Sequence, residues 1–417
     1  MSEGLRRERR AVVLVMDACG IGALPDAGEY GDEGTNTLAH LAEALGGLEL
    51  PSLERLGLGA IAPIEGVTPR VGPGVYGRLH AQGPGKDSTA GHWELMGVVM
   101  GNPPPTYPEG FPRETVERLV AAMGHGVICN RAYNGIAAIE DFGAEHLRTG
   151  ELILYTSQDS VLQLAAHVDR VGLEELYRAC GAARAAMTGE DGVGRVIARP
   201  FTGGEGSFRR AEGRRDFALE PPSRSYLEEL EGARSRVYGE GKVSDIFAGV
   251  GVSEVRPGAS NAQALQSTRA LLSEAPEGLI FVNLIETDQV YGHRKDFEGF
   301  YGALREIDGA VGDLLGDLRE EDLLIVTADH GVDMAHAGTD HTREHAPLLA
   351  VSGAALRGPG WGVRHEGPLA DVGATILRWL TGREARDLPG ASFLDGEGRP
   401  VEAAQPENAP GQSGRGA

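Results

Sequence analysis

Acidic and imidazole side chains follow three short apolar runs, and their types suit a metal-dependent reaction. These side chains are Asp17, Asp288, His293, Asp329, His330 and His341. Carboxylates alone suit Mg²⁺ or Ca²⁺, whereas carboxylates combined with neutral imidazoles suit a divalent transition metal. The sequence therefore predicts a metal site built from segments that lie far apart along the chain.

The apolar runs before these residues predict strands that are buried on both faces. They cover residues 12–16, 279–285 and 323–326 and are short, continuous and partly β-branched. In a parallel sheet the carboxyl ends of such strands meet at one edge, where open α/β sheets bind ligands. Six ligands suit two ions about 3.5–4 Å apart, which clamp the oxygens of a phosphoryl or sulfuryl displacement. Alternatively, these residues are ordinary turn carboxylates and surface imidazoles that bind no metal. The occurrence of such residues after three separate strands disfavours this alternative.

A hydroxyl that could act as the nucleophile lies between the first and second of these runs. Residues 83–97 are rich in glycine and contain the adjacent hydroxyls of Ser88 and Thr89, flanked by Lys86 and His92. A hydroxyl is a poor nucleophile until a metal or a base activates it. Glycine, serine and threonine together are also typical of an ordinary surface turn, and we expect a loop here.

The elements that position these residues predict an α/β fold with an inserted domain. We expect a mostly parallel sheet flanked by helices, formed by residues 1–102 and 219–395, with helices at 37–45, 261–274, 297–318 and 369–380. A proline-rich linker at 102–112 leads to a smaller α/β unit at 103–218, with strands near 152–157, 161–166 and 193–201 and helices at 113–123 and 173–187. Residues 396–417 have no apolar period and predict a disordered tail.

The inserted unit carries the clearest basic cluster of an acidic chain. Its members are Arg195, Arg199, Arg209, Arg210, Arg214 and Arg215. Clustered arginines either form a solvated face or bind phosphate, because the guanidinium group matches phosphate oxygens. The sequence leaves both readings open.

Composition excludes several classes of partner. The chain has 417 residues and a formal net charge of −22, which disfavours nucleic acid and anionic membranes. Its 3 cysteines are too few and too scattered for a disulfide framework and are typical of a reducing compartment. We see neither a secretory signal nor a membrane-spanning segment, so we expect a cytoplasmic protein, either a monomer or a weak homo-oligomer.

Seven motifs together resemble phosphopentomutase, a member of the alkaline phosphatase superfamily. They lie in order at residues 15–27, 85–97 (GKDSTAGHWELMG), 155–167, 194–201, 241–246, 288–296 and 327–344. D-H-G motifs occur throughout the superfamily, whereas residues 85–97 and the segments of the inserted unit are specific to the mutase. The resemblance implies an alkaline-phosphatase-like core with a cap domain and an isomerase that interconverts the 1- and 5-phosphates of ribose or deoxyribose.

The resemblance also implies a role for each matching position. One metal would be held by Asp17, Asp329 and His330, and the other by Asp288, His293 and His341, with Mn²⁺ as the expected ion. Ser88 stands at the position that is phosphorylated, and a hexose bisphosphate such as glucose 1,6-bisphosphate would prime it. In the cap, Ser157, Asp159 and Val161 would meet the ribose, and Arg195 and Arg210 would meet the distal phosphate, with Lys242 nearby. Ile197 is a further substrate-binding position.

The sequence departs from the family pattern at a few of these positions. The family has threonine where Ser88 stands, and Glu286 and Val332 replace the usual Asp and Asn. The cofactor-independent phosphoglycerate mutase also has a nucleophilic serine three residues before Gly-His, as Ser88 precedes Gly91. A phosphomonoesterase, a sulfatase or a phosphoglycerate-mutase-like enzyme would use the same metals, and a non-catalytic sugar-phosphate sensor remains a further alternative.

Overall fold

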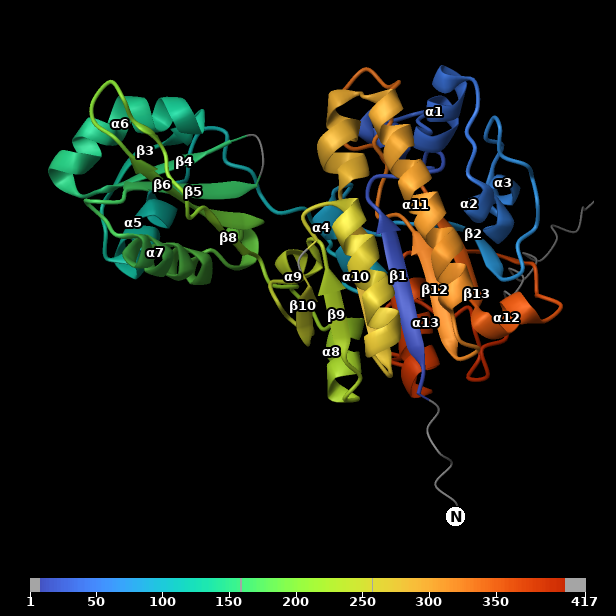
Figure 1. Ribbon diagram of the computed structural model, residues 1–417. Coiled ribbons are helices and arrows are strands. Elements are labelled where there is room, and N and C mark those ends of the chain that lie inside the picture. Colours follow the sequence, from blue (N-terminus) through green and yellow to red (C-terminus); the bar gives the residue numbers. More distant parts are fainter. Residues whose placement is uncertain (1–7, 158–159, 257, 402–417) are drawn as a thin grey trace, which may run out of the picture.

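The computed structural model describes residues 8–157, 160–256 and 258–401 and shows a large sheet flanked by helices (Figure 1). Eight strands form it in the order β10-β9-β11-β1-β12-β13-β2-β14. Their bounds are β1 Arg10–Met16, β2 Val75–His80, β9 Val237–Glu240, β10 Glu254–Arg256, β11 Gly278–Leu284, β12 Asp322–Thr327, β13 Ala346–Ser352 and β14 Val363–Pro368. Every neighbouring pair is parallel except the two that involve β13, so the predicted mostly parallel sheet is confirmed.

The three strands predicted from apolar runs lie side by side at the centre of this sheet. Every residue of β1, β11 and β12 is buried, because helices cover both faces. In the parallel register Met16 pairs with Leu284, and Val15 pairs with Thr327. The carboxyl ends of the three strands are therefore level with one another.

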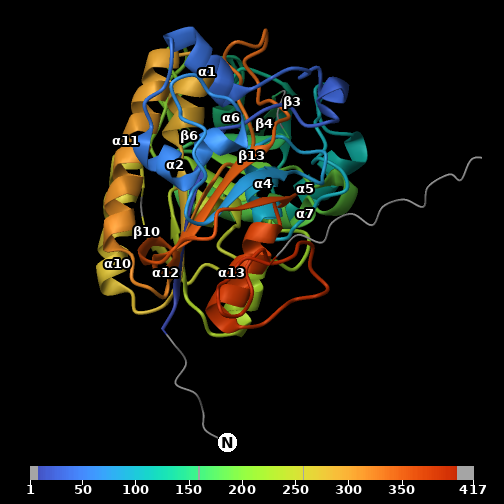
Figure 2. The same cartoon turned by 90° about the vertical axis from the view of Figure 1, so that its right-hand side faces the viewer.

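Two layers of helices enclose the sheet (Figure 2). One layer contains α1 Thr37–Leu45, α2 Pro51–Leu56, α3 Leu58–Ile61, α10 Asn261–Glu274 and α11 Phe297–Asp317. The other contains α4 Ser88–Leu95, α8 Tyr226–Gly232, α9 Val243–Ile246 and α13 Asp371–Thr381, while the short α12 Gly353–Arg357 follows β13. None of the helices in the described ranges is long and apolar enough to cross a membrane.

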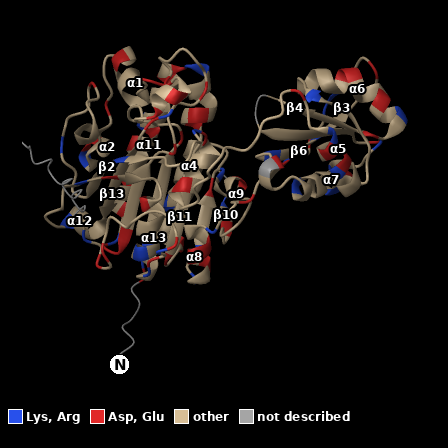
Figure 3. Cartoon of the chain, turned by 180° about the vertical axis from the view of Figure 1, so that it is seen from behind, with Lys and Arg blue, Asp and Glu red and all other residues tan. Residues whose placement is uncertain are grey.

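A second, smaller sheet forms a separate body that we term the small lobe, residues 113–218 (Figure 1). Its strands are β3 Val127–Ala132, β4 Leu152–Thr156, β5 Val161–His167, β6 Arg195–Thr202, β7 Arg209–Arg210 and β8 Arg215–Ala218. Helix α6, Gly135–Thr149, packs on one face, and α5, Arg113–Met123, and α7, Leu173–Ala186, pack on the other. The chain enters the lobe after α4 and leaves it before α8, and acidic and basic residues are mixed over both bodies (Figure 3).

The structure describes only the first part of the predicted disordered tail, residues 396–401. Residues 396–401 form a turn, in which Leu394 pairs with Pro400 and Gly398 lies against the ring of Trp379. Residues 402–417 lie outside the described residues. The first part of the segment that we assigned to the tail is thus packed on the large body.

One buried carboxylate in the sheet has no compensating partner. Glu240 ends β9 and is 0% exposed, and neither of its oxygens has a hydrogen-bond partner within the described residues. Burial raises the pKa of Glu240 to about 7, and nearby Ser267, Thr268 and Arg256 offset this rise only in part. The folded state therefore favours the protonated acid.

This raised pKa predicts a pH-dependent stability. The folded state holds the Glu240 proton more tightly than the unfolded chain, so the stabilisation is complete below about pH 4.5 and is lost as the pH rises through about 7. The difference corresponds to about 3 kcal/mol. Urea unfolding at pH 5 and pH 8 should show that Glu240→Gln removes this part of the pH dependence, whereas the exposed change Glu231→Gln should not. An equal dependence in both variants would contradict the assignment.

Candidate metal centre and nucleophile

Six potential metal ligands lie in two groups at the carboxyl edge of the large sheet. Asp17, Asp329 and His330 form the first group, and Asp288, His293 and His341 form the second. Asp17 follows β1 directly, Asp329 lies two residues after β12, and Asp288 lies in a helical turn after β11. The level ends of the three strands thus bring the candidate ligands together.

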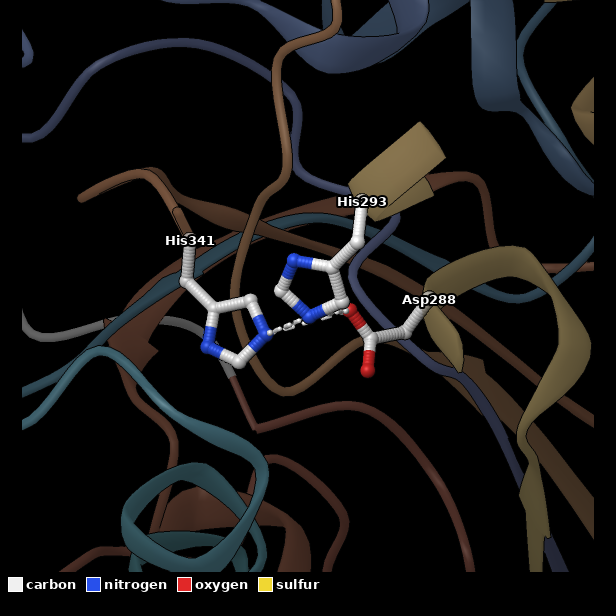
Figure 4. A group of neighbouring side chains, drawn as sticks. All are labelled: Asp288, His293 and His341. Carbon is white, nitrogen blue, oxygen red and sulfur yellow. Dashed lines mark hydrogen bonds and ion pairs between the residues drawn. The ribbon is translucent and has the colours of Figure 1, made fainter. Parts of the chain in front are cut away.

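The second group presents three ligand atoms toward one point (Figure 4). Nε2 of His341 lies 3.1 Å from Oδ1 of Asp288 and 3.1 Å from Nε2 of His293, which is 3.2 Å from the same oxygen. Nδ1 of His293 lies 2.7 Å from the carbonyl oxygen of Thr339 and donates its proton there, so Nε2 carries a lone pair. Two imidazole nitrogens and a carboxylate oxygen at such distances are a typical metal-binding set.

The first group is buried and is held by surrounding polar groups. Nε2 of His330 lies 3.4 Å from Oδ1 of Asp17 and 3.5 Å from Oδ2 of Asp329, and its Nδ1 donates to the carbonyl oxygen of Gly331 at 3.0 Å. Asn283 donates to Asp17 at 2.9 Å, and the N–H of Ala18 donates to Oδ1 of Asp329 at 3.1 Å. Oδ2 of Asp329 is buried and accepts no hydrogen bond among the described residues, although Nδ1 of His92 lies 3.0 Å away; an oxygen left open in this way fits a metal ligand.

The electrostatics of this edge favour a bound cation. Burial acts to raise the pKa of Asp329, but the charges of His330 and His92 outweigh it and lower this pKa to about 2. Burial acts to lower the pKa of His330, yet Asp329 and Asp17 raise it well above its ordinary value. The rings of His330 and His341 are 4.1 Å apart between centroids, so the two groups are neighbours.

The candidate nucleophile faces the first group from the start of a helix. Oγ of Ser88 lies 3.1 Å from Oδ1 of Asp17 and 3.2 Å from Nε2 of His330. The loop predicted here is wrong, because α4 begins at Ser88 and the side chain of Asp87 accepts hydrogen bonds from the N–H groups of Thr89 and Ala90. This cap and the helical hydrogen bonds outweigh the turn tendency of glycine and serine.

His92 is a positioning residue whose function the sequence did not reveal. Its ring is fully buried, and Nδ1 donates to the carbonyl oxygen of Ser88 at 2.8 Å and lies 3.0 Å from Oδ2 of Asp329. The ring therefore links the first turn of α4 to the metal-ligand group. The spacing of four residues between Ser88 and His92 would have indicated this contact if a helix had been predicted.

The two departures from the family pattern lie outside the six ligands. Glu286 accepts a hydrogen bond of 3.0 Å from the N–H of Asn261, the first residue of α10, and so turns toward that helix. Val332 is buried, and its side chain packs against Gly292, next to His293.

A basic cavity lies in the small lobe, away from these ligands. It has a volume of about 360 Å³. Its lining residues are Tyr133, Asn134, Gly135, Ser157, Val161, Gln163, Arg195, Ile197, Arg199, Arg210 and Arg214. Of the predicted substrate-binding positions, Lys242 lies elsewhere, at the start of α9 in the large body, and Asp159 lies outside the described residues.

The sequence missed the part of this cavity that β3 and α6 contribute. Tyr133 and Asn134 lie between these two elements, and Gly135 is the first residue of α6; neither element was predicted. The apolar residues of β3 are few, and only the Asn-Gly pair before α6 could have marked the start of a helix.

Comparison with known proteins identifies the chain. A family model described as Metalloenzyme superfamily matches residues 9–382. The chain is 46% identical over 387 residues to a phosphopentomutase of Desulfitobacterium hafniense, covering 93% of this chain and 99% of the relative. It is 47% identical over 369 residues to that of Carboxydothermus hydrogenoformans, covering 88% and 95%. A solved phosphoglycerate mutase of Leishmania mexicana is 12% identical, with a TM-score of 0.47 over 94% of this chain and 98% of the other.

The matches define first a class and then a family. The chain is a metal-dependent enzyme of the Metalloenzyme superfamily. It belongs to the phosphopentomutase family and is an isomerase.

The second ligand group predicts a specific loss of metal. Asp288→Ala removes the oxygen that both imidazoles face, so we expect one fewer divalent ion per chain and little remaining activity. Metal content can be measured by mass spectrometry after dialysis against Mn²⁺ and gel filtration. The matched control is Asp340→Ala, a neighbouring carboxylate with 80% side-chain exposure, which should keep full metal content. Equal metal content in the two variants would rule out this group as a metal site.

Proposed function

We propose that the chain interconverts ribose or deoxyribose 1-phosphate and the corresponding 5-phosphate through a phosphorylated Ser88. The observation that carries this proposal is the position of Ser88, whose Oγ lies within 3.1 and 3.2 Å of two candidate metal ligands. The arginine cavity of the small lobe supplies a second place for a phosphate. The curated relatives named phosphopentomutase support the same substrates.

The six candidate ligands fit two divalent ions, and we propose Mn²⁺. Asp17, Asp329 and His330 would hold one ion, and Asp288, His293 and His341 the other. When bound, the ions supply positive charge that stabilises the phosphoryl group during its transfer and helps to activate the hydroxyl. The orphaned Oδ2 of Asp329 and the close imidazoles of the second group are the observations that support this fit.

The residues of the chain position the transfer. Asp17 and His330 fix the Ser88 hydroxyl, and His92 holds the first turn of α4 against Asp329. Phosphoserine passes its phosphoryl group to the free hydroxyl of the pentose monophosphate, which gives a 1,5-bisphosphate. The bisphosphate turns end for end, and Ser88 takes back the other phosphate. A bisphosphate such as glucose 1,6-bisphosphate places the first phosphate on Ser88.

The small lobe would separate a mutase from a phosphatase. Water that reached phosphoserine would release inorganic phosphate, so the lobe must cover the site while the bisphosphate turns. We propose that residues 103–218 act as this cap. We expect small-molecule pentose phosphates as its partners. We also propose that the enzyme acts in the cytoplasm.

A coupled assay tests this function. With Mn²⁺ and glucose 1,6-bisphosphate present, ribose 1-phosphate should be converted to ribose 5-phosphate, and dialysis against a chelator should abolish the conversion until Mn²⁺ is restored. Release of inorganic phosphate without isomerisation would indicate a phosphomonoesterase. Full activity in the presence of the chelator would contradict the two-metal site.

The position of Ser88 predicts which hydroxyl is phosphorylated. Ser88→Ala should eliminate turnover and the mass increase of one phosphate after priming, because only Ser88 faces the candidate ligands. Ser88→Thr should retain activity, since the added methyl group leaves the hydroxyl in place. The control is Thr89→Ala, which should still be phosphorylated on intact-mass analysis. A phosphopeptide that maps to Thr89 would overturn the assignment and leave the metal site intact.

A further inference from the structure

The segment that presents Asp288 and His293 has an unusual backbone. Residues Thr287–Tyr291 form a π-helical turn, which we term the π-turn. The N–H of Gly292, the residue that follows it, reaches back to the carbonyl oxygen of Thr287, five residues earlier. Helices with this bonding pattern are rare and occur mostly as single turns at functional sites. The conformation of the π-turn therefore needs support from the residues around it.

The π-turn accounts for the spacing of five residues between the two candidate ligands. In an α-helix, residues five apart point about 140° away from each other around the helix axis. A π-type bond instead joins residues five apart, so their side chains lie on the same face. Thr287 and Gly292 are joined in this way, and the next residue after each is a ligand. As a result, Nε2 of His293 lies 3.2 Å from Oδ1 of Asp288 (Figure 4).

Glu286 and Asn261 fix the start of the π-turn to helix α10. The N–H of Glu286 donates to Oδ1 of Asn261 at 3.2 Å, and the N–H of Asn261 donates to Oε2 of Glu286 at 3.0 Å. Each side chain thus binds the backbone of the other residue. Asn261 is the first residue of α10 and is fully buried, so Glu286 takes up one of the N–H groups that have no partner within the helix. The partial positive charge at this end of α10 also favours the carboxylate.

Other contacts hold the rest of the π-turn. Oγ1 of Thr287 donates to the carbonyl oxygen of Asp17 at 2.6 Å. At the far end, a methyl group built on Gly292 would lie 2.6 Å from Cγ1 of Val332 and 2.9 Å from the carbonyl oxygen of Thr287, so no side chain fits there. The two positions at which the sequence departs from the family pattern, Glu286 and Val332, thus lie against the two ends of the π-turn.

We propose that Glu286 and Asn261 are positioning residues for the second metal ion, because their reciprocal hydrogen bonds keep the π-turn in the conformation that brings Asp288 and His293 together. This inference rests on the proposed two-ion site. Glu286 acts through its acceptor oxygen, since its contact is with a backbone N–H. Asn261 also acts through its oxygen, because its buried Nδ2 has no hydrogen-bond partner in the part of the chain that the structure describes.

Titration of the whole protein with Mn²⁺ tests this inference. Glu286→Ala and Asn261→Ala each remove one of the two hydrogen bonds, so we expect the Kd of one ion to rise about tenfold and that of the other to stay nearly unchanged. Alanine is a strong helix former, so Asn261→Ala should not unfold α10. Free Mn²⁺ can be measured by electron paramagnetic resonance. In the coupled assay, the Mn²⁺ concentration for half-maximal activity should rise more than kcat falls.

The control for a lost charge is Glu298→Ala. This change removes an exposed carboxylate from the first turn of α11 and should leave both Kd values as they are in the parent protein. Glu286→Gln separates position from charge, because glutamine keeps an acceptor oxygen at the same reach. It should bind both ions nearly as tightly as the parent. A loss in Glu286→Gln as large as in Glu286→Ala would overturn the positioning function of this side chain.

Two further outcomes distinguish this inference from the proposals on which it rests. Unchanged Kd values in both Glu286→Ala and Asn261→Ala, together with loss of an ion in Asp288→Ala, would overturn the inference and leave the two-ion site in place. Two bound ions without isomerisation in the coupled assay would contradict the proposed function. A raised Kd in the two alanine variants would still support the positioning of the second ion in that case.

Discussion

The parallel register of β1, β11 and β12 forces negative charge into a buried edge of the protein. Asp17, Asp288 and Asp329 each lie at the end of one of these strands and are at most 5% exposed. Charges of like sign this close repel strongly where water is excluded, and no hydrophobic contact can offset that cost. The edge therefore requires positive charge, and divalent ions held by these residues would supply it. The hydrogen bonds from Asn283 and Ala18 keep the carboxylates in position for that charge.

The same edge determines where a nucleophile can lie. Ser88 starts a helix in the layer opposite α10 and α11, and the amino end of that helix adds a further partial positive charge. Asp87 and His92 fix the helix from both sides of Ser88, so the hydroxyl is held by a helix rather than by a mobile turn. A defined position matters because a transfer reaction is sensitive to displacements of about 1 Å.

The sequence was most informative where local pattern and burial agree. Continuous apolar runs located β1, β11 and β12, and apolar periodicity with a glycine stop located α1. It was least informative at α4, where six of eight residues are buried and no apolar face distinguishes helix from loop. The strands β2, β13 and β14 and the pair β3 and α6 were also missed. The β2 strand contains Gly77 because a side chain there would meet the backbone of His365, a contact visible only after folding.

The candidate site also contains contacts between distant segments that the local sequence does not reveal. Residue types at strand ends were sufficient to select all six candidate ligands, because parallel topology brings strand ends together. The arginine-lined cavity of the small lobe was not foreseeable in this way. Gln163, Arg199 and Gly135 come from β5, β6 and α6, and their proximity depends on the pairing of strands within the small lobe. Arg199 was part of the basic cluster, yet its sequence neighbours did not show that Asp216 would pair with Arg214 while Arg199 donates to Gln163.

The two regions that we propose to bind phosphate differ in chemistry, and this difference suits a mutase. The edge of the large sheet combines a hydroxyl with ligands for recruited cations, so a phosphate there can react. The cavity of the small lobe is lined by Arg195, Arg199, Arg210 and Arg214, whose charges are permanent, so we propose that a phosphate there is held but not attacked. Because a bisphosphate carries a phosphate at each end, either end can occupy either region after it turns. The direction of transfer then depends only on which end reaches Ser88, and the small lobe has to retain the intermediate long enough for that exchange.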